Sequence, residues 1–364
     1  MSSVGRPEPR VPRPADRSEP LRVWVSNMPE ADLFDRHQRL WLVPIVRAHL
    51  DADDDPAVLA DRYGSLLSHY VLCGPDEAEV ALLPRLVTSG DDPSIRPTVD
   101  EAERRGLRTL VFGGGDLEPV VRSAAAIVVH PGPTRGAQPD ADVLAQPYFV
   151  TDRWRGPMER SDTERPSVAF CGQGASRPGA GVVQLVRRGA SSLRNRGRGS
   201  VVPAPVRGHI RLRARALASL ARHPGVDDRF VIRDRYRAGG GGPAARARAE
   251  EEFDDNLRCA TYALCVRGTG NFSARFYEAL SFGRVPLFVN TSCVLPFEDE
   301  IIWRDHVVWA DDSEVEELGD RLVAAHSRGV GERRLPHAIR LLWEQRLSQD
   351  GYFSHLPGAV RRLL

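Results

Sequence analysis

A short glycine-bearing loop in the second half of the chain carries the side chains best suited to chemistry. Gly268 and Gly270 let the backbone approach a ligand closely, and Arg267 comes directly before them. Guanidinium groups and free backbone N–H groups bind phosphate oxygens, and the start of a helix adds the positive end of its dipole. We therefore predict a diphosphate site here. Its residues are Arg267, Gly268, Gly270, Asn271, Ser273, Arg275 and Glu278.

The residues after the loop could contact different parts of a nucleotide ligand. Arg275 can contact the phosphates, and Glu278, one turn further along, can accept hydrogen bonds from ribose or sugar hydroxyls. The local pattern also has a plainer interpretation, in which Ser273 is a helix N-cap and Arg275 pairs with Glu278 on the surface. Such a pair is worth less than about 1 kcal/mol. The pattern alone leaves both interpretations open.

The elements around this loop form one predicted βαβ unit. Apolar runs indicate strands over Tyr262 to Val266 and Val285 to Val289, and the intervening stretch Ser273 to Phe282 has helical spacing, with Gly283 as its stop. The loop then lies where the first strand ends. Ligands gather at that carboxyl edge in open parallel sheets.

Further apolar runs that end in glycine-rich or turn residues occur throughout the chain, among them Leu107 to Phe112, Ala124 to His130 and Val168 to Cys171. Strands of this kind, separated by helix-length segments, are typical of a parallel α/β sheet. We predict an α/β fold with parallel sheets. Residues 1–20 form a disordered tail, residues 21–160 and 161–330 form two Rossmann-like domains, and residues 331–364 form helices that can pack back on the first domain.

Composition excludes several classes of protein. The 364 residues carry a net charge of +1, which gives no general electrostatic footprint for nucleic acid. All 50 basic residues are Arg, so a P-loop lysine or a lysine Schiff base is excluded. Five scattered cysteines without a CxxC spacing argue against a disulfide framework and a zinc site, which favours the reducing cytoplasm. No apolar run reaches the roughly 20 residues of a membrane span, so we expect no integral membrane segment.

The stretch from Asp254 to Asp312 holds four short motifs in a fixed order. They are Arg267-Gly268, the run Ser273 to Ala279, the turn Gly283 to Pro286 and the run Leu295 to Asp299. Together they resemble the carboxyl-terminal signature of the exostosin-type glycosyltransferases. Weaker likenesses to that family lie upstream in Asp76 to Pro84, Phe112 to Asp116 and Asp142 to Tyr148.

The resemblance implies a GT-B architecture, in which two Rossmann-like domains face each other. The carboxyl-terminal domain would hold the nucleotide-sugar, with UDP as the expected nucleotide, and the amino-terminal domain would hold a hydroxyl- or amine-bearing acceptor. It implies an inverting sugar transfer without a metal or other cofactor, and the acidic pairs Asp254-Asp255 and Asp311-Asp312 lack the Asp-x-Asp spacing of a metal-diphosphate site. The oligomeric state stays open, with a homodimer as one option.

An inverting transfer needs a general base from the first domain. Asp116 and His130 both follow predicted strands and are our candidates for this catalytic role. Each has a structural alternative, because Asp116 suits a helix N-cap and His130 can simply end a buried strand. Asp35 and His37 are a third, weaker possibility.

Functions other than a sugar-transferring enzyme are also compatible with the sequence. A catalytically inactive relative could serve as a scaffold or partner of another transferase. An enzyme with a dinucleotide cofactor is disfavoured because the loop lacks GxGxxG. The Arg-rich stretch from Arg187 to Arg215 lacks the interleaved aromatic residues of a nucleic-acid surface and is predicted to be a solvated loop, although Arg211 or Arg213 can reach the diphosphate.

Overall fold

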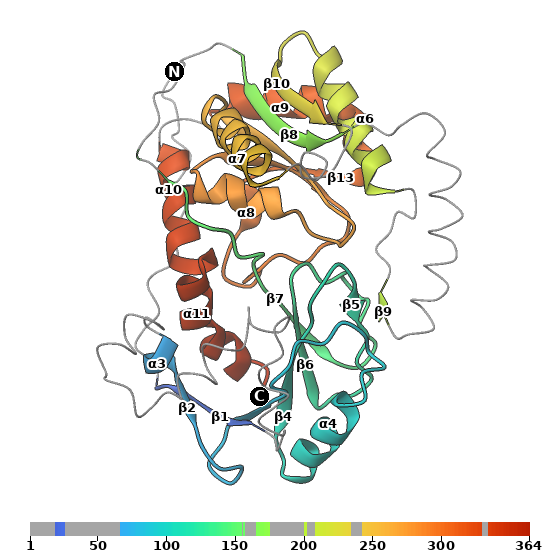
Figure 1. The fold of residues 1–364 in the computed structure, drawn as a ribbon, viewed down its shortest axis with the longest axis vertical. Coiled ribbons are helices and arrows are strands. Elements are labelled where there is room, and N and C mark those ends of the chain that lie inside the picture. The colour runs from blue at the N-terminus through green and yellow to red at the C-terminus, as the bar shows by residue number, and fades with distance from the viewer. Residues whose placement is uncertain are drawn as a thin grey trace, which may run out of the picture.

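The computed structural model describes residues 19–25, 66–154, 156, 165–174, 200–201, 208–233, 242–329 and 334–364. Most of the predicted tail, together with the candidates Asp35 and His37, lies outside these residues. The described chain forms a first half up to residue 154 and a second half over residues 165–329, followed by C-terminal helices (Figure 1).

The first half holds a six-stranded parallel sheet in the order β2-β1-β3-β4-β6-β7. Helix α4 packs on it through Ile95 and Val99, which share a buried cluster with Val111 and Val128. The elements are β1 (Leu21–Val25), α3 (Leu66–His69), β2 (Tyr70–Leu72), β3 (Val80–Leu82), α4 (Ile95–Arg104), β4 (Arg108–Phe112), β5 (Glu118–Pro119), β6 (Ala126–His130) and β7 (Asp142–Ala145).

The second half holds a five-stranded parallel sheet in the order β10-β8-β11-β12-β13. Strand β11 is buried along its whole length, as expected where helices cover both faces of a parallel sheet. The elements are β8 (Ser167–Gln173), β9 (Ser200–Val201, antiparallel to β5), α6 (His209–Arg222), β10 (Asp227–Arg233), α7 (Pro243–Arg258), β11 (Tyr262–Val266), α8 (Ala274–Ser281), β12 (Val285–Asn290), β13 (Val308–Asp311) and α9 (Leu318–Ser327).

The two sheets share one topological feature. In each sheet the first strand in the sequence, β1 or β8, lies between the second and the third. The strand order therefore reverses between β1 and β3 in the first half and between β8 and β11 in the second. Such switch points are where open α/β sheets bind ligands.

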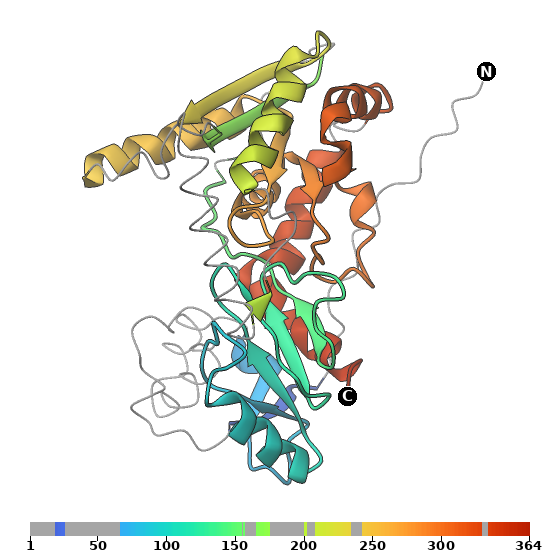
Figure 2. The same ribbon diagram turned by 90° about the vertical axis from the view of Figure 1, so that its right-hand side faces the viewer.

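The C-terminal helices run along both halves, as Figures 1 and 2 show from two directions. They are α10 (Arg334–Leu342), a π-helical turn (Trp343–Leu347) and α11 (Gln349–Arg361). Arg340 of α10 donates to the Ser281 carbonyl of the second half at 2.5 Å. The Tyr70 hydroxyl of the first half donates to the Phe353 carbonyl of α11 at 2.7 Å. The chain end therefore contacts both sheets.

The α/β class with two parallel sheets, predicted from the sequence, is confirmed, and the arrangement is that expected of GT-B. The carboxyl edges of the two sheets face each other, because residues after β4 and β6 contact residues after β11 and β12. Among the described residues no helix has the length and apolar character needed to cross a membrane.

Candidate functional site

The two halves meet at a junction formed by residues 131–135 of the first half and residues 270–272 and 290–298 of the second. The Arg135 amide donates to the Ser292 carbonyl at 2.8 Å, and the Val294 amide donates to the Pro133 carbonyl at 2.9 Å. These bonds join the segments as a short antiparallel bridge. The predicted ligand loop therefore lies between the two sheets.

Asn271 ties this loop to the first half. Its side-chain amide nitrogen donates to the Thr134 hydroxyl at 3.1 Å, and its oxygen accepts from the Thr291 hydroxyl at 2.6 Å. The residue is only 2% exposed. Although the sequence predicted a ligand-binding role for Asn271, the structure gives it partners on both sides of the junction.

The backbones of the two halves approach each other closely at Gly132. Its φ is +90°, and a Cβ atom there would lie 2.7 Å from the Asn271 carbonyl oxygen. Next to it, the Tyr148 ring stacks on Phe272 with centroids 5.3 Å apart. Residues of the first half therefore pack directly against the 270–272 part of the loop in the second half.

The glycine amides of the loop have acceptors within the chain. The Gly268 amide donates to the Phe272 carbonyl at 2.9 Å, and the Gly270 amide donates to the Asp116 carboxylate. Ser273 is the N-cap residue of α8, but its side chain makes no capping hydrogen bond. The open set of amides expected from the sequence is therefore not found at the two glycines, where a diphosphate would have to displace Asp116 to reach Gly270.

Arg275 extends from α8 across the end of β8. It donates to the Cys171 carbonyl, and its guanidinium lies over the Phe170 ring, 4.3 Å from the centroid. A carbonyl and an aromatic face orient a guanidinium without neutralising its charge. Arg275 therefore brings positive charge to the switch point of the second sheet.

Two further arginines reach the same edge. Arg213 of α6 donates to the Gln173 carbonyl at 2.7 Å and to the Arg267 carbonyl at 3.0 Å. Arg267 follows β11 and is 5% exposed. We call Arg213, Arg267 and Arg275 the guanidinium cluster. Because it lies where β8 and β11 end, its place and charge suit an anionic ligand such as a diphosphate.

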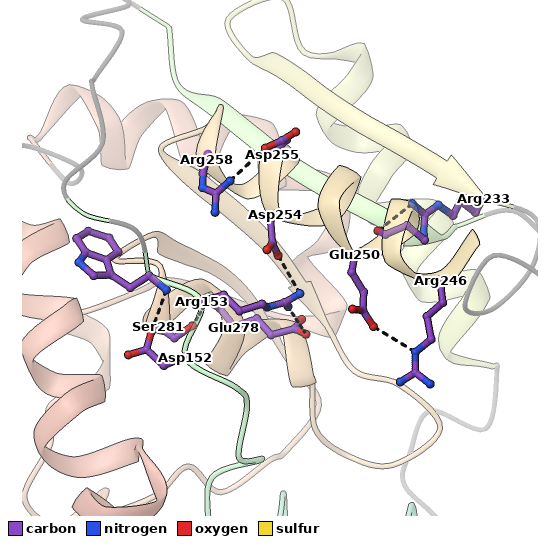
Figure 3. A network of polar contacts seen from close by, with 12 residues as sticks. Asp152, Arg153, Arg233, Arg246, Glu250, Asp254, Asp255, Arg258, Glu278 and Ser281 are labelled. Atoms are coloured by element: carbon purple, nitrogen blue, oxygen red, sulfur yellow. Dashed lines mark hydrogen bonds and ion pairs between the residues drawn. The ribbon is translucent and has the colours of Figure 1, made fainter. Parts of the chain in front are cut away.

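Glu278 pairs with a residue that sequence analysis missed, as Figure 3 shows. Arg153, from the segment between the halves, lies 2.9 Å from Asp254 Oδ1 and 3.8 Å from Glu278 Oε1. The suggested surface pair of Arg275 and Glu278 is therefore replaced by Arg153 and Glu278. Burial raises the pKa of Glu278, Arg275 and Arg153 lower it, and Asp254 raises it again.

The two candidate bases, Asp116 and His130, differ in their exposure to solvent. Asp116 is exposed and lies beside the loop, and desolvation raises its pKa while the Gly270 amide lowers it. His130 is 1% exposed at the end of β6, where a Cβ on Gly113 would come within 2.8 Å of its ring. Burial lowers the pKa of His130 to about 4. Its imidazole is therefore neutral at pH 7 and shielded from solvent.

A model of the Exostosin GT47 domain matches residues 140–325, just over half of the chain. The chain belongs to the Exostosin GT47 domain family. The predicted resemblance is confirmed, and the match covers the guanidinium cluster, Arg153 and Glu278.

Several curated proteins resemble parts of this Exostosin GT47 chain. Exostosin-1 of Drosophila melanogaster is 30% identical over 94 residues, which cover 26% of this chain and 12% of that protein. The probable beta-1,4-xylosyltransferase IRX10 of Arabidopsis thaliana is 34% identical over 117 residues, covering 30% of this chain and 28% of that protein. The chain thus spans less than a third of the length of these relatives.

One solved structure, of the glycotransferase of kitacinnamycin, aligns over 97% of this chain and 100% of its own. Its TM-score is 0.30 and its sequence identity 12%. At those values the likeness supports no conclusion about this Exostosin GT47 chain.

The family motif at Leu295 to Asp299 lies in the junction. Glu298 accepts from the Leu295 amide at 2.8 Å with one oxygen and pairs with Arg135 at 2.5 Å with the other. This motif of the Exostosin GT47 domain therefore fixes the local turn and contacts the first half.

Potential metal ligands are scattered in the described part of the chain. No group of three or more His, Cys, Asp or Glu side chains there is placed to hold a metal ion. Metal independence stays a prediction.

Proposed function

We propose that this chain transfers a sugar, with inversion, from a nucleoside diphosphate donor to a hydroxyl- or amine-bearing acceptor without a divalent metal. UDP is the proposed nucleotide. The observation that carries the proposal is the guanidinium cluster at the switch point of the second sheet, in a chain of the Exostosin GT47 domain family.

The cluster would act on the leaving group. Cleavage of the bond between the sugar and the diphosphate leaves negative charge on the β-phosphate, and fixed cations stabilise that charge as it forms. Arg213 and Arg275 are already oriented by carbonyl acceptors, so little reorganisation is needed. Glu278 would accept hydrogen bonds from the ribose hydroxyls.

Asp116 is the better candidate for the base. It is exposed, and it lies at the junction beside the loop proposed to hold the donor. Its raised pKa strengthens a carboxylate as a proton acceptor. His130 is enclosed, and its lowered pKa makes the imidazole a weaker base.

Calorimetric titration with UDP, GDP, ADP and TDP tests the donor assignment. We expect UDP to bind the wild-type chain and Glu278→Ala to weaken it about tenfold, since a hydrogen bond to a charged group is worth about 1.5–3 kcal/mol. Arg304→Ala, at an exposed position in the short helix before the edge strand β13, is the control and should bind UDP normally. The proposal is wrong if none of the four nucleotides binds the folded wild-type protein. Turnover should also survive EDTA, and strict dependence on a divalent ion would contradict the metal-free site.

An inactive scaffold is the alternative, and one observation favours it. The Gly268 and Gly270 amides already donate within the chain, as they would in a site that no longer takes a ligand. Separate Asp116→Asn and His130→Gln variants distinguish the two functions. An enzyme loses turnover at one of these positions while it keeps nucleotide affinity, whereas a scaffold has no turnover to lose.

A cytoplasmic location is part of the proposal. All five cysteines are free thiols, and three of them, Cys171, Cys265 and Cys293, are buried. Unpaired thiols are usual in reducing compartments.

A further inference from the structure

Arg153 lies in a position that the proposed donor site does not by itself explain. It belongs to the segment that leaves the first sheet, yet its guanidinium inserts between two helices of the second half (Figure 3). There it lies 2.9 Å from Asp254 of α7 and 3.8 Å from Glu278 of α8, and 5.5 Å from the centre of the Phe253 ring. One cation therefore bridges two carboxylates from different helices.

The segment that carries Arg153 is held on its other side. Asp152 accepts from both terminal nitrogens of Arg340 at 2.8 and 2.7 Å. Arg340 also donates to the Ser281 carbonyl at the end of α8. Adjacent residues of opposite charge thus fix the segment to α10 on one side and to α7 and α8 on the other.

Glu278 and Asp254 carry two negative charges in this region, and Arg275 and Arg153 carry the two positive charges that balance them. Asp254 of α7 is buried, with a side chain 7% exposed, and its negative charge raises the pKa of Glu278. Arg275 of α8 is the other nearby cation, but the proposed site assigns it to the diphosphate. The thiols of Cys171 and Cys265 face the same region, and burial raises the pKa of both, so they are uncharged at neutral pH.

We propose that Arg153 is a positioning residue that orients the Glu278 carboxylate toward the ribose hydroxyls of the donor. This inference rests on the proposed function, because it takes Glu278 as the ribose contact. It also implies that the ribose contact depends on the segment joining the two halves, since the backbone of that segment sets where the Arg153 guanidinium lies.

Removing Arg153 changes the protonation of Glu278. Burial already raises the pKa of this carboxyl and Arg153 lowers it, so Arg153→Met raises it further. A protonated carboxyl accepts hydrogen bonds less well than a carboxylate. As the pH is lowered, the affinity of the variant for UDP should therefore begin to fall at a higher pH than that of the wild-type chain. Asp254→Asn in the same variant should flatten the profile, because it removes the repelling charge.

A ligand pair isolates the ribose contact. We compare UDP with 2′,3′-dideoxyuridine 5′-diphosphate by calorimetry in the wild-type chain, Arg153→Met, Arg153→Lys and the control Arg246→Met. Arg246 pairs with Glu250 on the exposed surface of α7. We expect the wild-type and control proteins to prefer UDP about tenfold, Arg153→Met to prefer it less than about twofold, and Arg153→Lys to lie between them.

The possible outcomes distinguish a failure of the proposed function from a failure of the role proposed for Arg153. If the wild-type protein binds no nucleotide, the proposed function fails. If it prefers UDP and Arg153→Met keeps that preference, or weakens both ligands equally, Arg153 does not position Glu278. A wild-type protein that binds both ligands equally overturns the ribose assignment of Glu278, and the inference with it.

Discussion

The two sheets have the same strand reversal, but the described side chains at the two reversals differ in charge. In the second half, the residues of the guanidinium cluster lie at the ends of β8 and β11. In the first half the residues directly after β1 lie outside those that the structure describes. There β3 is followed by Leu83 and Pro84, and the next residue, Arg85, pairs with Asp92 at 3.5 Å. Strand order thus provides an edge for a ligand in each half, and the side chains placed there decide which ligand it suits. The proposed site of the diphosphate is the edge of the second sheet, and the proposed site of the acceptor is in the first half.

The largest effect should come from the first half. Asp116→Asn should lower turnover about 100-fold or more, because general base catalysis contributes about that much, while UDP affinity changes less than about twofold. The asparagine oxygen can still accept from the Gly270 amide, so the junction is preserved. Steady-state kinetics and calorimetry measure the two quantities, with exposed Asp140→Asn as the control. Equal turnover in both variants would show that Asp116 is not the general base.

Matched arginine substitutions compare the two edges directly. Arg275→Met should weaken UDP binding between about tenfold and 100-fold, the range for a lost charged hydrogen bond. Arg85→Met, at the corresponding edge of the first sheet, should leave it unchanged within about twofold. Similar losses in the two variants would show that the donor is not confined to the second half. Melting temperatures of both variants check that the fold is intact.

Gly132 tests how tightly the halves are joined. Gly132→Ala places a Cβ atom 2.7 Å from the Asn271 carbonyl and also strains a backbone with φ of +90°, so we expect a loss of about 2 kcal/mol or more in unfolding free energy. Gly136→Ala is the matched control, because its φ is +71° and no atom lies within 4 Å of the added Cβ. Chemical denaturation should show the smaller loss at Gly136. Equal losses would mean that the junction yields to the extra methyl group.

The smallest effect concerns the contact between the chain end and the first half. Arg361 of α11 donates to Glu79 at 2.8 Å and holds the pKa of that carboxyl below its usual range. The stabilisation is therefore complete above the ordinary carboxyl pKa and is lost as the pH falls through the lowered pKa of the folded state. Arg361→Met should cost about 1 kcal/mol or less at pH 7 and progressively less in acid. Denaturation at pH 7 and pH 3 measures the difference, and a cost that does not shrink in acid would assign it to packing.

Local pattern was enough to find the βαβ unit and the arginines near it. The strand expected at Tyr262 to Val266 has those bounds in the structure, and the helix expected from Ser273 begins one residue later. Apolar runs, a glycine-bearing loop and a glycine stop are properties of neighbouring residues, so a sequence displays them directly. Arg267 and Arg275 were found with the unit because they flank its loop.

The partners of the loop could not be found in that way. Asp116 precedes Gly270 by more than 150 residues, and Arg153 precedes Glu278 by more than 100 residues. Several strands and helices lie between the two members of each pair in the sequence. Periodicity indicates which face of an element is buried, but it contains no information about which distant element covers that face. Arg153 lies in a polar connecting segment, where a charged residue has no distinguishing pattern.

By itself the sequence determined the class of fold, the position of the loop at a strand end and the presence of positive charge beside it, because these follow from short-range geometry and residue type. Only the tertiary structure decided that the Asp116 carboxylate accepts a hydrogen bond from the Gly270 amide and that Asn271 joins the two halves. It also decided that Arg153, and not Arg275, forms the ion pair with Glu278. Hydrogen bonds and ion pairs act over a few ångströms, so their partners are set when the sheets dock against each other.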